Sequence, residues 1–144
     1  MRRVWIGLLL GAIVLSACAP AATPTVPPEK QVVVIYERSG GIAGRSDRWL
    51  IYSDGSIVDA QGKGVQVSVE EVNALLTHIS NAGFFSWAET YLPEDPCCDR
   101  YTHKLTVMAG GKSHSVTTLD GTTGTPPELW TVLEEVQQLV SRIP

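Results

Sequence analysis

The spacing of hydrophobic residues in the first half of the chain predicts three β-strands. A run of β-branched residues is typical of a buried strand, and two further apolar runs follow it. The predicted strands are Val32–Tyr36, Arg48–Tyr52 and Ser56–Ala60. Asp54-Gly55 favours a two-residue turn, because both central positions of such a turn accept positive φ. That turn would pair Tyr52 with Ile57, and Ile51 with Val58.

Two stretches with helical spacing predict amphipathic helices. The first follows Ser68-Val69-Glu70-Glu71, in which the serine can cap the helix and the second glutamate can reach back, and Gly83 can end it. Its apolar positions are Val69, Val72, Leu75, Leu76 and Ile79. The second follows a similar sequence, Thr125-Pro126-Pro127-Glu128, and proline is tolerated in a first turn. Its apolar positions are Leu129, Val132, Leu133, Val136, Leu139, Val140 and Ile143.

The segment between the two helices predicts a β-hairpin. Apolar and polar residues alternate in Tyr101–Ala109, so Tyr101, His103, Leu105 and Val107 share one face. Gly110-Gly111 turns the chain into a second strand, Lys112–Thr118. The hairpin pairs Leu105 with Val116 and Val107 with His114, which keeps His103 and His114 roughly 13 Å apart along the strands.

These elements follow the order β-β-β-α-β-β-α. Helices that pack on one face of an antiparallel sheet make an α+β domain. We therefore expect residues 31–144 to form one α+β domain, with an antiparallel sheet of about four to five strands and two helices on one face. A chain of 144 residues leaves no room for a second domain of ordinary size.

The N-terminus has the pattern of an export signal. Arg2 and Arg3 precede the apolar run Val4–Leu15, which is too short to span a bilayer. Leu15-Ser16-Ala17-Cys18 resembles a bacterial lipobox, which implies cleavage after residue 17 and attachment of fatty acyl chains to Cys18. Several acyl chains on one residue hold a protein firmly on a membrane. The alternative is a short membrane anchor that is never cleaved.

The residues after the signal predict a tether. Residues 18–30 contain four prolines together with alanine and threonine, and such a stretch favours extended chain over a core. The prediction is therefore a signal peptide in 1–17, a lipidated tether in 18–30 and an extracytoplasmic domain in 31–144, held on a bacterial cell membrane or outer membrane. We expect no nucleic-acid partner, because the formal net charge is −4 and phosphates require a basic face. Removal of the signal leaves 9 of the 11 basic residues against 15 acidic ones, a charge of −6.

Cys97-Cys98-Asp99, with His103 four residues on, is the part of the sequence that most suggests side-chain chemistry. The two cysteines could form a disulfide between neighbours, which an oxidising envelope permits, or they could be ordinary thiols. With Asp99 and His103 they also suggest a metal site, but adjacent cysteines rarely turn toward one ion, and no CxxC or HxxxH spacing is present. We therefore expect no metal and no other cofactor.

The sequence gives little support to an enzyme. It contains no Gly-x-Ser-x-Gly, P-loop, HExxH or EF-hand motif. The pairs Glu70-Glu71 and Glu134-Glu135 lie on helices, where neighbouring side chains point about 100° apart, so neither pair makes an acid–base dyad. We expect no catalytic residue. An enzyme that uses Cys97, Cys98 and His103 is the weakest of the alternatives.

A glycine-rich segment between the first two strands is the best candidate for a binding loop. Three glycines expose backbone groups without side chains to shield them, so such a loop can approach a partner closely. The alternative is a flexible connection between strands. The candidate partner-binding residues are Arg38, Ser39, Gly40, Gly41, Ile42, Ala43 and Gly44.

These motifs occur in the order found in emfourin-type domains, small proteins typified by an inhibitor of the thermolysin-like zinc protease protealysin. Tyr36–Gly44 resembles the opening of the family, and Gly83-Phe84-Phe85 resembles its first helix end. The strands Tyr101–Val107 and His114–Thr117 are similar to the later part. The resemblance covers about residues 32–143 and implies an α+β inhibitor without activity of its own. This chain differs in its lipoprotein signal, its Asp54-Gly55 hairpin and its Cys97-Cys98 loop.

The leading hypothesis is a membrane-anchored lipoprotein that inhibits a thermolysin-like metallopeptidase, with the Arg38–Gly44 loop docked in the active-site cleft. The resemblance supplies the class of target. The loop is assigned from its own chemistry. The rival hypothesis is a structural or binding lipoprotein of the envelope that inhibits no protease.

Overall fold

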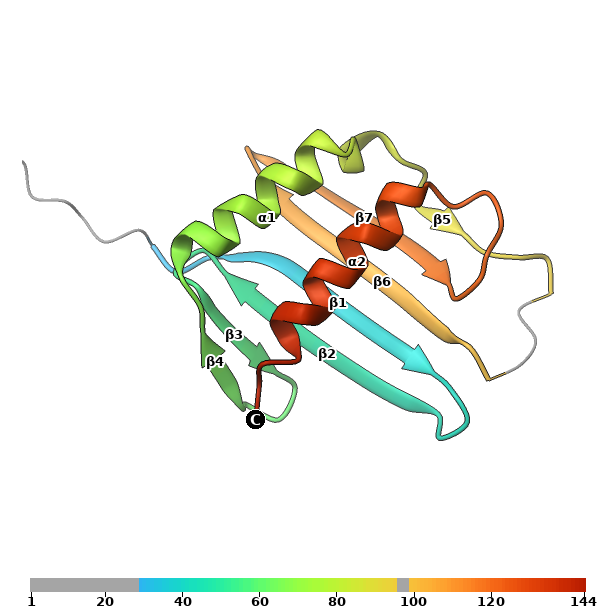
Figure 1. Cartoon of the computed structure of the whole chain (residues 1–144), viewed down its shortest axis with the longest axis horizontal. Helices are drawn as coiled ribbons and strands as arrows, with labels where there is room; N and C mark the ends of the chain where they lie inside the picture. Colours follow the sequence, from blue (N-terminus) through green and yellow to red (C-terminus); the bar gives the residue numbers. More distant parts are fainter. Residues whose placement is uncertain (1–28, 96–98) are drawn as a thin grey trace, which may run out of the picture.

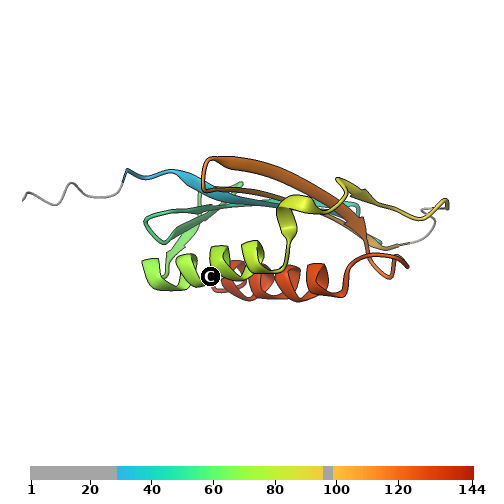
Figure 2. The ribbon, with the colours of Figure 1, turned by 90° about the horizontal axis from the view of Figure 1, so that it is seen from above.

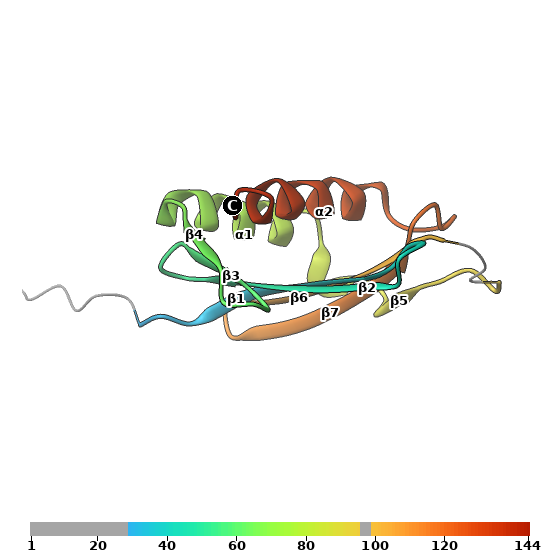
Figure 3. The same cartoon turned by 90° about the horizontal axis from the view of Figure 1, so that it is seen from below.

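The computed structural model describes residues 29–95 and 99–144 as a two-layer α+β domain. A seven-stranded sheet forms one layer, and two helices form the other layer on a single face of the sheet (Figure 1, Figure 2, Figure 3). The predicted signal peptide, Cys18 and the Cys97-Cys98 pair lie outside the described residues. Within the part of the chain that is described, no helix has the length and apolar character needed to cross a membrane.

The elements follow one another with short connections. The strands are β1 (Val32–Gly40), β2 (Arg45–Tyr52), β3 (Ser56–Asp59), β4 (Gly64–Gln66), β5 (Thr90–Tyr91), β6 (Tyr101–Ala109) and β7 (Lys112–Leu119). The helices are α1 (Val69–Asn81), the 3₁₀ turn η1 (Phe84–Ser86) and α2 (Pro127–Val140). The strand order in the sheet is β4-β3-β2-β1-β6-β7-β5, so β1 lies at its centre.

The sheet is larger than the four to five strands expected, and it is mixed rather than antiparallel. The two additional strands, β4 and β5, have three and two residues, too few for an alternating pattern to show in the sequence. The strand β5 pairs in parallel with β7, whereas the other neighbours are antiparallel. Both short strands lie at the edges of the sheet, where short strands limit pairing with other chains.

One predicted hairpin register is confirmed and the other is wrong by one residue. In β6–β7, Leu105 lies opposite Val116, as expected. In β2–β3, Ile51 lies opposite Ile57, and Tyr52 does not pair with Ile57. The turn holds three residues, because the Asp54 Oδ1 accepts hydrogen bonds from the backbone N–H and the hydroxyl of the residue that follows Gly55. The longer turn places two fully buried isoleucines side by side on the core face.

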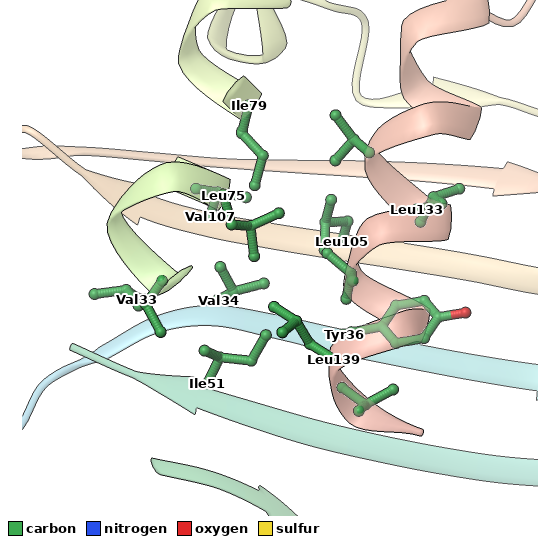
Figure 4. Close-up of a cluster of buried hydrophobic side chains, with 14 of the residues drawn as sticks. Val33, Val34, Tyr36, Ile51, Leu75, Ile79, Leu105, Val107, Leu133 and Leu139 are labelled. Atoms are coloured by element: carbon green, nitrogen blue, oxygen red, sulfur yellow. The ribbon is translucent and has the colours of Figure 1, made fainter. Parts of the chain in front are cut away.

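The core lies between the sheet and the two helices (Figure 4). Strands contribute Val34, Ile51 and Val107, and helices contribute Ile79 and Leu133, each at most 2 % exposed. Each such side chain stabilises the fold by about 1.5–3 kcal/mol when it leaves water. The helical spacing seen in the sequence therefore points both helices at one face of the sheet.

The predicted cap of α1 is confirmed, and the predicted cap of α2 is wrong. The Ser68 hydroxyl accepts the Glu71 backbone N–H, and the Glu71 carboxylate accepts the Ser68 backbone N–H. In α2 the residue before the helix is Pro126, and no side chain caps it. The Thr125 hydroxyl bonds the Thr118 hydroxyl at 3.3 Å instead, because Thr125 lies one residue too early to reach the helix backbone.

The strands β1 and β2 extend beyond the predicted apolar runs as far as the glycine-rich turn. Polar pairs continue the ladder: Glu37 lies opposite Arg48, and Arg38 lies opposite Asp47. Pairing of opposite charges across the strands compensates for the lack of hydrophobic residues there. The result is a hairpin whose turn lies at one end of the domain, while the chain enters β1 at the other end (Figure 1).

Candidate partner-binding site

The predicted binding loop is shorter in the structure: residues 41–44 form the turn of the β1–β2 hairpin, whereas Arg38, Ser39 and Gly40 lie in β1. Gly40 pairs with Arg45, and residues 41–44 make the turn between them. The Gly44 N–H donates to the Gly41 carbonyl oxygen at 3.0 Å and closes the turn. We call residues 40–45 the tip hairpin. The segment is therefore a defined turn at the end of a two-stranded ladder, which is what a docking loop needs.

Gly41 has a packing role that the sequence did not show. Its φ is +69°, and a Cβ there would lie 2.7 Å from the Tyr101 ring. Its N–H donates to the Arg100 carbonyl oxygen at 3.1 Å. Gly40 is equally confined, since its Cβ would lie 2.5 Å from the same carbonyl oxygen. These two glycines thus let the hairpin lie flat against the start of β6, and the following residues are the ones that face outward.

Ile42 is the most exposed large hydrophobic side chain of the described residues. It is 89 % exposed, and Leu92 follows at 47 %. Single exposed hydrophobic residues are common on protein surfaces, so exposure alone indicates little. Ile42, however, stands at the apex of a constrained turn, with Ala43, Gly44 and Arg45 exposed beside it. An aliphatic side chain in that position can enter a pocket of a partner without rearrangement of the domain.

Arg38 fixes the base of the tip hairpin. Its guanidinium carbon lies 5.0 Å from the centre of the Tyr101 ring and 5.5 Å from that of Trp49. Its Nη2 donates to the Asp47 carboxylate at 2.9 Å, and the Arg45 Nε lies 3.7 Å from the same carboxylate. The side chain of Arg38 is only 26 % exposed. A cation held between two aromatic faces and a carboxylate is strongly confined, so Arg38 serves the shape of the hairpin more than direct contact with a partner.

A polar cluster of Tyr36, His103 and Asp120 lies beside the tip hairpin, with the first two buried and the Asp120 side chain 42 % exposed. The His103 Nε2 donates to the Asp120 Oδ1 at 2.7 Å, because a carboxylate only accepts, and Nδ1 lies 2.8 Å from the Tyr36 hydroxyl. His103 is 5 % exposed and Tyr36 is fully buried. Burial raises the pKa of the Tyr36 hydroxyl well above its ordinary value of 10.0, and the nearby Arg38 charge opposes this only in part. The cluster is therefore structural in character.

Three segments meet at the tip-hairpin end of the domain. The start of β6 contacts the hairpin through the Arg100 carbonyl, and the Arg100 Nη1 donates to the Asp120 carbonyl oxygen at 3.1 Å. Asp120 begins the connection from β7 to α2, which lies at the same end (Figure 1, Figure 3). Segments gathered at one end of a rigid sheet are a common arrangement for binding sites.

The cavities in the described residues lie mainly elsewhere. Two of about 460 and 500 Å³ surround the β6–β7 turn and share Gly110 and Lys112 among their lining residues, at the end of β1 where the chain enters. A smaller one of about 190 Å³ lies between Trp49 and the last turn of α2. Across residues 29–95 and 99–144, no group of three His, Cys, Asp or Glu side chains is placed to hold a metal ion.

The structure places all the predicted loop residues in one hairpin and sets His103 opposite Arg38 on the neighbouring strand. Arg38–Gly44 form one hairpin. His103 lies beneath it with both ring nitrogens engaged, and His114 bonds the Trp87 carbonyl oxygen instead of His103. No local pattern in the sequence marks Tyr101 and Asp120 as supports of the hairpin, because both lie far from it along the chain.

Comparison with known proteins assigns the chain to no family. No model of a known protein family matches the chain, and no curated protein matches it. A functional proposal therefore rests on the tip hairpin and on the sequence resemblance to emfourin-type domains.

Proposed function

We propose that the chain is a membrane-anchored extracytoplasmic lipoprotein that inhibits a thermolysin-like zinc metallopeptidase by docking the tip hairpin in its active-site cleft. The observation that carries the proposal is Ile42, 89 % exposed at the apex of a turn whose flanks are fixed. The resemblance to emfourin-type domains supplies the class of target. Cys18 is the proposed site of the lipid.

The shape of the hairpin suits insertion into a cleft. Only the turn projects, because Gly40 and Gly41 lie against β6 and Arg38 is held beneath them. A loop that already has its bound shape loses little conformational entropy on docking, which favours tight binding. An aliphatic side chain at its apex would fill an apolar pocket, and exposed Arg45 beside it would lie at the rim of the contact.

The placement of the proposed anchor suits the same function. The chain enters the domain before Val32, and the tip hairpin begins at Gly40, at the opposite end of the same strand (Figure 1). Eight residue steps in β1 correspond to about 26 Å. A domain anchored through Cys18 and the residues that follow it would therefore present Ile42 away from the membrane, where an extracytoplasmic partner can reach it.

The proposal is tested with substitutions at the two exposed large hydrophobic residues. The wild-type domain, Ile42→Asp and Leu92→Asp are compared as inhibitors of thermolysin-like peptidases. We expect Ile42→Asp to weaken inhibition at least 100-fold and to melt at the wild-type temperature, because Ile42 makes no core contact. Leu92→Asp is the matched control and should inhibit within about 3-fold of wild type.

Two results would contradict the proposal. Equal loss in both variants would mean that the contact is not centred on the tip hairpin. No inhibition by a folded wild-type domain would favour the rival function, a binding module of the envelope whose partner is another protein.

A further inference from the structure

We propose that Tyr101, Asp120 and His103 are positioning residues that hold the tip hairpin in its binding shape from beneath. The inference rests on the proposed function, because it concerns the same hairpin. None of the three lies at the apex: His103 is 5 % exposed, Tyr101 lies under Gly41, and Asp120, with its side chain 42 % exposed, belongs to the β7–α2 connection. Their effect on a partner would therefore pass through the shape of the turn.

The first link joins Tyr101 to the hairpin. The Tyr101 ring lies so close to Gly41 that a single added carbon would overlap it. The ring also contacts the Arg38 guanidinium, whose carbon lies 5.0 Å from the ring centre. Tyr101 thus occupies the space into which the turn would otherwise collapse, and it also orients the cation that pairs with Asp47.

The second link joins Tyr101 to Asp120. The Tyr101 N–H donates to the Asp120 Oδ2 at 3.1 Å, and the Asp120 N–H donates back to the Tyr101 carbonyl oxygen at 2.9 Å. The carboxylate uses its other oxygen for the His103 Nε2, at 2.7 Å. One side chain thus fixes both the backbone at the start of β6 and the ring of a buried histidine two residues further along that strand.

The third link joins His103 back to the base of the hairpin. Its Nδ1 bonds the hydroxyl of Tyr36, whose ring is stacked on Trp49 with centres 5.2 Å apart. Trp49 in turn lies 5.5 Å from the Arg38 guanidinium. The contacts therefore close into a ring of six residues that starts and ends under the turn: Arg38, Tyr101, Asp120, His103, Tyr36 and Trp49. We call it the support ring.

A closed ring of contacts restrains the hairpin better than separate contacts do. Each member makes two of these contacts; Tyr101 makes one through its ring and the other through its backbone, so a change at one member reaches two neighbours. Loss of one interaction within such a network affects the others, which is the usual behaviour of contacting residues. A change at Asp120 should therefore alter the turn at Gly41 and Gly44, although Asp120 belongs to the β7–α2 connection and not to the turn.

The test measures the motion of the turn without any partner. Amide hydrogen exchange at Gly41 and Gly44 is compared in the wild-type chain, Asp120→Ala, Tyr101→Leu and Tyr101→Phe. Lys104→Ala is the control, since Lys104 is exposed on β6 and lies 3.6 Å from the carboxylate of Glu37. We expect at least 10-fold faster exchange at both glycines in Asp120→Ala and Tyr101→Leu, with exchange in α1 unchanged. Tyr101→Phe should match wild type, because it retains the ring.

Inhibition of a thermolysin-like peptidase gives the second readout. We expect Asp120→Ala and Tyr101→Leu to bind about 10-fold more weakly, mainly through slower association. Unchanged exchange in both variants would overturn the inference. If the wild-type domain inhibits no peptidase but exchange at Gly41 and Gly44 is faster in the variants, the support ring holds and the proposed function fails. The two proposals can therefore fail separately. If Asp120→Ala does not fold, the exchange rates of Gly41 and Gly44 in Tyr101→Leu test the inference alone.

Discussion

At the scale of single residues, Gly41 and Gly44 allow two costs of substitution to be compared. One is the cost of a left-handed backbone conformation, and the other is the steric overlap of an added Cβ with a neighbouring side chain. Gly41 and Gly44 both have positive φ, +69° and +56°. A Cβ at Gly41 would overlap Tyr101, whereas a Cβ at Gly44 would meet no atom within 4 Å. The two positions therefore allow a matched comparison.

We predict that Gly44→Ala lowers the free energy of unfolding by about 1–2 kcal/mol, because a left-handed conformation costs that much for a residue with a Cβ. Gly41→Ala should cost about 1–3 kcal/mol more, since overpacking adds to the conformational term. Urea denaturation measures both. Equal losses in the two variants would show that Tyr101 does not restrict the turn.

The buried Tyr36 hydroxyl predicts a specific dependence of stability on pH. Its pKa is raised by burial, so the folded protein keeps the proton at a pH where the unfolded chain releases it. Stability is therefore fully present below the unfolded pKa of about 10 and falls as the pH rises above it. At pH 11, one unit above the ordinary tyrosine pKa, the loss from this one group is on the order of 1 kcal/mol.

Tyr36→Phe isolates this effect. At pH 8 we predict that the variant is less stable by about 1–3 kcal/mol, because the Nδ1 of buried His103 loses its partner. The difference from wild type should shrink between pH 9 and pH 11, since only the wild type has the tyrosine to titrate. Urea denaturation midpoints of both proteins at pH 9 and pH 11 test this. A stability difference that stays constant between the two pH values would contradict the raised pKa of Tyr36.

At the scale of elements, the two helix starts provide a further comparison. Ser68 caps α1 with a complete capping box, whereas Thr125 makes no bond to the backbone of α2. We predict that Ser68→Ala costs about 1 kcal/mol and that Thr125→Ala costs clearly less. Thermal melts of the two variants test this. A larger loss in Thr125→Ala would mean that its bond to Thr118 matters more than a helix cap.

The sequence predicted those elements whose pattern is long enough to be distinctive. The β6–β7 register was predictable because apolar and polar residues alternate along the nine residues of β6, where His103, Leu105 and Val107 are the buried ones. The β2–β3 register was not, because the Asp54 side chain lengthens a turn that the dipeptide Asp54-Gly55 alone would make shorter. The strands β4 and β5 are too short to show any period.

The tip hairpin could be predicted, but its supports could not. Three glycines near a single isoleucine mark the turn in the sequence. The contacts that hold it come from Tyr101 and Asp120, which reach it only because β6 pairs beside β1. Such contacts depend on which strands are neighbours in the sheet. No local motif predicts that order, because it results from the packing of the whole sheet.

At the scale of the whole molecule, β1 separates the proposed anchor from the proposed site. If Cys18 carries the lipid, Cys18→Ala should move the protein from the membrane fraction to the soluble extracytoplasmic fraction, because the acyl chains supply the membrane affinity. Labelling with a radioactive fatty acid and fractionation of cells test this prediction. A Cys18→Ala protein that is still labelled and still sediments with membranes would contradict it.

The central claim is that the tip hairpin blocks a thermolysin-like active site. The most direct measurement titrates a fixed concentration of such a peptidase with the domain from Glu29 onward, which contains every core residue from Val33 to Val140. The account predicts that activity falls linearly and reaches zero near one domain per peptidase. Full activity at a large excess of folded domain would contradict it.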